Sequence, residues 1–106
     1  MSWDVSMAID TGGEYPATVC EVRNLTWNNS KILVALKCHP DDMSGKTGAE
    51  IAPIARKALA DSWTREASLK KMEPENKWGG VNDVRDYLAK LVEACEKNPK
   101  AVLVVH

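Results

Sequence analysis

The chain has 106 residues, of which 44% are hydrophobic and 27% charged, and its formal net charge is −1. These values are typical of one globular domain, and they exclude disordered and collagen-like classes. The charge also argues against binding to duplex nucleic acid, which requires a basic surface. The longest apolar runs, residues 32–36 and 101–105, are far shorter than the roughly 20 residues of a membrane-spanning helix. We therefore expect one domain over residues 1–106 that makes no contact with a membrane.

The cysteines indicate a reducing compartment. Cys20, Cys38 and Cys95 are an odd set without a Cys-x-x-Cys pair, and the first residues lack the pattern of a secretory signal. Reduced thiols in the cytoplasm follow from this pattern. Ligand pairs at zinc-binding spacing are also missing from the sequence, so we expect neither a metal nor a cofactor.

The first quarter of the chain predicts an antiparallel hairpin. Apolar side chains alternate with polar or small ones over residues 3–9, which is the period of a strand with one buried face. Glycines and a proline in residues 11–16 allow a reversal, and residues 17–27 are rich in β-forming side chains. The alternation breaks at residues 21–24, which predicts a bulge or an early exit from the sheet.

Two helices are expected in the middle of the chain. Asn28, Asn29 and Ser30 are all competent N-caps for a short helix that ends at about Cys38. Residues 39–46 read as a loop. The sequence Thr-Gly-Ala-Glu at 47–50 is a capping box, and apolar residues recur at helical spacing from there to Trp63.

The last third predicts a minor helix, a long helix and a strand. The minor helix covers about 65–72, and residues 73–80 are irregular. The clearest amphipathic pattern runs from Val81 to Cys95, and Asn98 and Pro99 end this helix. Residues 101–105 are apolar on both faces, which favours a strand inserted beside the hairpin over an exposed edge. The predicted fold is α+β, with a three-stranded, mainly antiparallel sheet covered by three to four helices in the order ββααβ plus the minor helix. Trp3 and Trp63 are expected in the core.

Two segments raise the possibility of catalysis. Residues 44–48 resemble the tail of a phosphate-binding loop, but Pro40 stands where that motif needs a glycine; the amides of the following helix could still bind an anion. Cys38 and His39, followed by Asp41 and Asp42, supply a thiol, an imidazole and carboxylates close together in sequence. A small hydrolase or transferase is therefore an alternative, although catalysis needs a base within hydrogen-bond reach of the nucleophile.

A polar segment is the first candidate for binding. In an extended chain Asn24, Thr26 and Asn28 would lie on one side, and Ser30 would follow at the junction with the helix. These side chains could read the donors and acceptors of a ligand. The alternative is local turn chemistry, in which Asn and Ser satisfy nearby backbone groups.

The second candidate is the loop that contains Asn76, Trp78 and Gly79. A tryptophan followed by glycines places a flat ring beside backbone that a ligand can approach closely. The alternative is a tryptophan that fills the core beneath the loop.

The chain also resembles a family of small accessory proteins encoded by tailed bacteriophages of Gram-positive hosts. The resemblance rests on Asn-x-Thr-x-Asn-x-Ser at 24–30, on Thr-Gly-Ala-Glu at 47–50, and on the family's Asn-Pro-x-Asn-Gly-Trp-Gly loop at 73–79. Glu73 and Lys77 replace the Asn and the first Gly of that loop, so roles of those two residues are not carried over. The resemblance implies a phage accessory protein that acts in the host cytoplasm.

We therefore expect a binding protein without catalysis. Its ligand would be a small molecule, such as a nucleotide signal to be sequestered, or a host protein to be masked. A self-associating structural protein, and hence a homo-oligomer, is a further possibility. The predicted binding residues are Asn24, Thr26, Asn28, Ser30, Asn76, Trp78 and Gly79.

Overall fold

The structure is a computed structural model that describes residues 1–10, 12–14, 17–75 and 78–106. Three strands and several helices form an α+β fold, which confirms the predicted class and the predicted hairpin with a C-terminal strand. In chain order the elements are β1 (Ser2–Ile9), β2 (Ala17–Thr26), the 3-10 turn η1 (Trp27–Asn29), α1 (Ser30–Ala35), α2 (Pro40–Met43), α3 (Gly48–Thr64), α4 (Glu66–Lys70), α5 (Val81–Lys97) and β3 (Val102–Val105).

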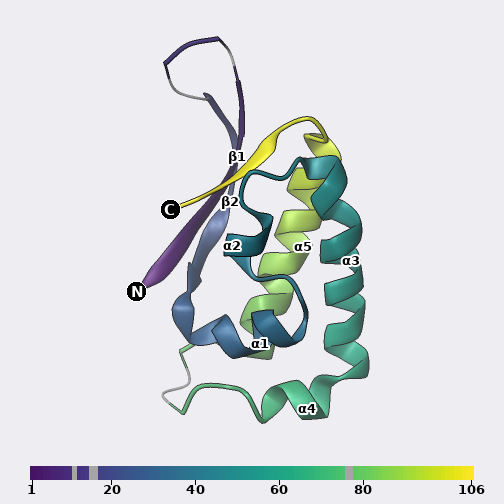
Figure 1. The fold of residues 1–106 in the computed structure, drawn as a ribbon. Coiled ribbons are helices and arrows are strands. Elements are labelled where there is room, and N and C mark those ends of the chain that lie inside the picture. The colour runs from purple at the N-terminus through teal and green to yellow at the C-terminus, as the bar shows by residue number, and fades with distance from the viewer. Residues whose placement is uncertain (11, 15–16, 76–77) are drawn as a thin grey trace.

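The sheet has the order β2-β1-β3 and is antiparallel throughout. Helices α3 and α5 lie side by side against one side of it, and α4 closes the far end of the helical layer (Figure 1). Val5 and Met7 of β1 are buried in the same hydrophobic core as Leu88 and Leu91 of α5. Burial of such side chains is the main driving force for docking the amphipathic helices on the sheet.

The predicted bulge is confirmed. Val5 pairs with Arg23 and Ser6 pairs with Glu21, so Val22 is an extra residue on β2. Because of the bulge, Arg23 pairs with Val5, whose side chain points into the core. The side chain of Arg23 therefore points toward α5 and not toward the open face of the sheet.

The prediction for the C-terminal strand is wrong in one respect, because β3 lies at an edge. It pairs with β1 on one side only, and segment 45–47 partly covers its other side. The amide of Gly45 donates to the carbonyl of Leu103 (2.8 Å), and the amide of Leu103 donates to the carbonyl of Lys46 (2.9 Å). These bonds satisfy edge groups that would otherwise need water or another strand, which explains how an apolar strand is tolerated there.

The prediction of a loop over residues 39–46 is wrong as well, because α2 occupies Pro40–Met43. Pro40 is at the first helical position, where its fixed φ suits a helix and its missing amide costs little. Nδ1 of His39 accepts a hydrogen bond from the amide of Asp41 (3.2 Å) and so caps the helix. His39 and Pro40, which the sequence suggested belong to a loop, therefore begin a helix.

Trp3 is buried as predicted, but Trp63 is 62% exposed. The inward position at the end of α3 belongs to Ser62, whose hydroxyl and carbonyl accept from the buried guanidinium of Arg85 (3.1 and 2.7 Å). Arg85 also lies 3.6 Å from the centre of the Trp63 ring. A buried guanidinium needs several partners, and the tryptophan covers it from the solvent side.

Candidate functional site

The junction between β2 and α1 is built by local hydrogen bonds. The hydroxyl of Thr26 accepts from the amide of Asn28 (3.4 Å), and the hydroxyl of Ser30 donates to the carbonyl of Trp27 (2.7 Å). Turn chemistry thus accounts for Thr26 and Ser30. The chain is extended only as far as Thr26, so the expected alternation does not reach Asn28, which follows in the 3-10 turn.

Asn29 is the residue that the sequence analysis missed as part of a site. Its side chain is fully buried. Its Oδ1 accepts from the amide of Gly80 (2.7 Å), and its Nδ2 donates to Oδ2 of Asp83 (2.6 Å). One amide therefore joins the strand–helix junction to the start of α5. Three cap-forming residues in a row were visible in the sequence, but nothing in their order shows which one turns inward.

Gly79 brings the two motifs into direct contact. Its φ is +98°, a conformation that favours glycine. A Cβ at this position would lie 2.5 Å from Oδ1 of Asn29 and 3.0 Å from Cγ2 of Thr26. The backbone of the second motif thus packs against side chains of the first, and only glycine leaves room for it. Asn76 lies outside the described residues.

Charged side chains extend this junction along α5. One guanidinium nitrogen of Arg23 lies 2.6 Å from Oδ1 of Asp83, and the other lies 2.8 Å from Oδ2 of Asp86. At the helix start, Oε2 of Glu73 accepts from the amide of Val81 (2.9 Å). Because carboxylates already occupy the positive end of α5, this helix start is not available to an external anion.

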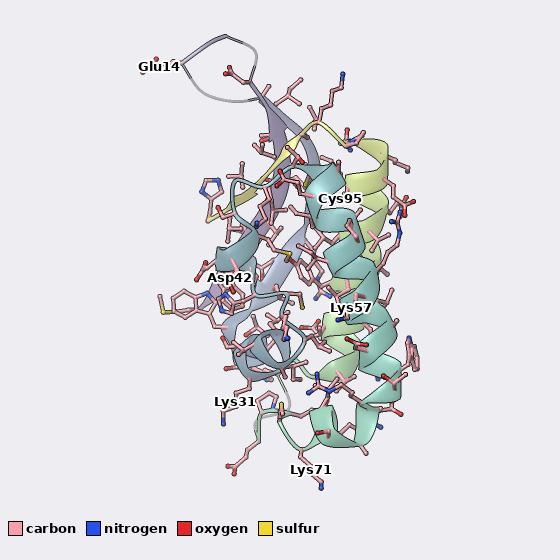
Figure 2. The ribbon with its side chains drawn as sticks, turned by 45° about the vertical axis from the view of Figure 1, so that its right-hand side comes forward. Glu14, Lys31, Asp42, Lys57, Lys71 and Cys95 are labelled. Carbon is pink, nitrogen blue, oxygen red and sulfur yellow. The ribbon has the colours of Figure 1, made fainter. Side chains whose placement is uncertain are left out.

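A groove of about 510 Å³ opens beside the junction. It is lined by Asn28 and Ser30 together with Trp27, Lys31 and residues 71–75. Lys31 and Lys71 lie at the same end of the molecule (Figure 2). The groove therefore contains two of the predicted binding residues together with residues that the sequence did not point to.

A second hollow, of about 440 Å³, connects the loop to Gly79. Residues 73–75 line both hollows, and Gly79 lines the second one. Trp78 is 72% exposed, so it does not fill the core. Asn24 is apart from this region: its Nδ2 donates to Ser2 and Asp4 of β1 (2.9 and 2.8 Å), and it lines a different hollow.

The geometry around Cys38 does not support thiol chemistry. Cys38 is fully buried, its Sγ donates to the carbonyl of Leu33 (3.7 Å), and burial raises the pKa of its thiol to about 12. Nδ1 of His39 is occupied by the amide of Asp41. A nucleophilic cysteine needs a thiolate that a substrate can reach, and this residue offers neither.

The helix start at residues 47–50 does not bind an anion through its amides. The amides of Gly48 and Ala49 donate to the carbonyls of Ala101 and Pro99 (2.8 and 2.9 Å). The predicted capping box is confirmed, since the hydroxyl of Thr47 accepts from the amide of Glu50 (3.3 Å), and the Glu50 carboxylate accepts from the amide of Thr47 (3.1 Å). These bonds to Thr47 lower the pKa of Glu50.

The described ranges contain no cluster of three or more side chains suited to a metal ion. Within the same ranges, no helix is long and apolar enough to cross a membrane. Comparison of the chain with protein-family models, with curated proteins and with solved structures finds no match.

Proposed function

We propose that this chain is a phage accessory protein that binds and masks a host protein without catalysis. The proposed contact surface, here called the junction face, comprises the groove residues Trp27, Asn28, Lys31 and Lys71, and we include the exposed Trp78 because it directly precedes Gly79. The observation that carries the proposal is the buried side chain of Asn29, which ties the strand–helix junction to Gly80 and Asp83. Both candidate motifs thereby become parts of one preorganised surface, and preorganisation lowers the entropic cost of binding.

The composition of the junction face favours a protein partner. Trp27 is 43% exposed and Trp78 is 72% exposed, and aromatic side chains of this kind are typical anchors of protein interfaces. Lys31, Lys71 and Glu75 form a polar rim of both signs around the groove. The resemblance to phage proteins supplies the source of the partner, a host cell.

A small ligand is the second candidate. The groove volume of about 510 Å³ falls within the range of known small-molecule sites, about 300–1,000 Å³. Asn28 and Ser30 would supply polar contacts, and Trp27 would supply stacking area. A sequestered nucleotide signal belongs to this class.

Photo-crosslinking tests the proposal. A photoreactive amino acid at position 28, in the groove, is compared with the same amino acid at position 89, an exposed site on α5 outside the groove. Each protein is irradiated in host lysate, and the adducts are identified by mass spectrometry. An excess of unlabelled Asn28→Arg or Ala89→Arg protein serves as competitor.

We expect one host protein to crosslink from position 28 and not from position 89. Unlabelled Ala89→Arg protein should abolish this adduct by competition, whereas Asn28→Arg protein should not, because the added side chain obstructs the groove. Equal adducts from both positions, or equal competition by both variants, would contradict the proposal. A small molecule that co-purifies with the native chain and is lost in Asn28→Arg would favour the second candidate instead.

A further inference from the structure

Another groove, which shares no lining residue with the junction groove, has a different chemical character. It has a volume of about 450 Å³ and lies between the end of α1 and one face of α3. Ala35, Leu36 and Ile54 form its apolar part, while Lys37, Lys57, Asp61 and Arg65 supply the charges. Lys57 lies on the side of α3 that faces α1 (Figure 2). The groove thus combines three cations with a single carboxylate in a chain whose net charge is −1.

These three cations differ from many of the other basic residues. Among the described residues, six other cations form salt bridges with carboxylates, namely Arg23, Arg56, Lys70, Arg85, Lys90 and Lys97. Across the described part of the chain, Lys37, Lys57 and Arg65 form no salt bridge, although Asp61 lines the same groove. Arg65 donates from one nitrogen to the carbonyl of Ala35 (2.9 Å), which fixes its guanidinium at the groove. A guanidinium has five donors, so this bond leaves capacity for a ligand.

The backbone at Lys37 is strained. Its φ is +58°, and among the residues that the structure describes it is the one non-glycine residue with positive φ. The amide of Lys37 donates to the carbonyl of Val34 (3.1 Å), and the amide of Cys38 donates to the carbonyl of Leu33 (3.0 Å). This is the Schellman ending of a helix, in which the left-handed position is usually glycine. Here it carries a lysine that lines the groove.

The electrostatics of a helix end give a partial account of the lysine. Cations near the last carbonyls of a helix are favourable, but the effect is small at an exposed site. A left-handed conformation costs a side chain more than that, and glycine would adopt it without strain. Strained residues that persist at a concave, charged site are a recognised pointer to ligand binding.

We propose that this groove binds a small organic phosphate, with Lys37, Lys57 and Arg65 around the phosphate and the organic part against Leu36 and Ile54. Lysine and arginine are the usual partners of phosphate groups. The volume of about 450 Å³ suits a small molecule. The site is separate from the junction face, so it stands or falls independently of the proposed masking of a host protein.

Isothermal titration calorimetry with AMP, and with adenosine as the uncharged probe, tests this site. The variants are Lys37→Gly, Lys57→Gln and the control Lys100→Gln, since Lys100 is exposed and lies outside the groove. We expect saturable binding of AMP, none of adenosine, and a loss of about tenfold in affinity for each groove variant, which corresponds to a charge-assisted hydrogen bond. Lys100→Gln should bind AMP as the native chain does.

Lys37→Gly has a second readout, because relief of the strained backbone should raise the urea midpoint of unfolding while AMP binding weakens. If Lys37 had only a structural role, the Lys37→Gly change would alter the urea midpoint without weakening AMP binding. The proposal is overturned if AMP shows no saturable binding, if adenosine binds as tightly, or if Lys100→Gln weakens binding as much as Lys57→Gln. Tighter binding of a hexaglutamate peptide than of AMP would also overturn it, in favour of an acidic protein partner.

Discussion

Replacement of Asn29 by alanine should destabilise the fold strongly. The side chain is fully buried and makes one hydrogen bond to the Asp83 carboxylate and one to the Gly80 amide. A bond to a charged group is worth about 1.5–3 kcal/mol and a neutral one about 0.5–1.5 kcal/mol. Gly80 is itself buried, so its amide would be left without a partner. We expect Asn29→Ala to lower the free energy of unfolding by about 2–4 kcal/mol.

Urea unfolding followed by circular dichroism measures this loss. With an m value of about 2 kcal/mol/M, the midpoint should fall by about 1–2 M. The matched control is Asn28→Ala, the adjacent amide, whose side chain is exposed in the groove. We expect the control to change stability by less than about 0.5 kcal/mol. The reasoning would be refuted if both variants lost equal free energy of unfolding, or if Asn29→Ala lost less than about 0.5 kcal/mol.

Three further predictions concern other parts of the fold. Gly79→Ala should cost more stability in urea unfolding than Gly45→Ala, because both residues have positive φ but only the Cβ at 79 would meet neighbouring atoms; equal costs would argue against close packing. Arg85→Met should lower the free energy of unfolding by about 3 kcal/mol, because the Ser62 carbonyl and hydroxyl lose their buried donor; a thermal melt within error of the native chain would contradict this. Burial raises the pKa of Cys38 to about 12, so the contribution of this thiol to stability should be constant below about pH 8.5 and then fall by up to about 1.4 kcal/mol per pH unit.

The sign of the cysteine effect follows from proton counting. Between the unfolded and folded pKa values the unfolded chain has lost the thiol proton and the folded chain has kept it, so rising pH favours unfolding. Urea titrations at about pH 7.5 and about pH 10 measure the slope for the native chain and for Cys38→Ala. The alanine variant should lose less stability between the two pH values. Identical slopes would show that Cys38 does not contribute.

Much of the fold could be predicted because its signals are periodic. The alternation in residues 3–9 and the helical spacing in residues 81–97 each depend on a single pattern that burial then satisfies. The broken alternation near Val22 likewise announced a bulge. The strands and helices at these positions form because their apolar side chains are buried away from water, and the spacing of apolar residues is visible in the sequence.

The errors arose where a residue's role depends on a distant partner. Trp63 has the spacing of a core residue. The structure instead places Ser62 inward, where it accepts hydrogen bonds from Arg85 of α5, and the Trp63 ring covers the Arg85 guanidinium. The apolar strand β3 is tolerated at the sheet edge because the backbone of Gly45, more than fifty residues earlier in the chain, bonds to it. Neither relation is visible in a local window of sequence.

The candidate site shows the same division. Thr26 and Gly79 belong to motifs that the sequence singled out, but their contact is a tertiary event. Asn28 and Asn29 are chemically identical neighbours, and only the 3-10 turn decides that Asn29 faces Gly80 while Asn28 faces the groove. Propensity rules alone do not separate two such residues.

Amide hydrogen exchange at Gly80 tests most directly whether the two motifs form one surface. In the native chain this amide is buried and donates to Oδ1 of Asn29, so it should exchange slowly. In Asn29→Ala its protection should fall far more than that of amides in the middle of α5, such as Leu91. Fast exchange of Gly80 in the native chain, or unchanged protection in the variant, would contradict the account.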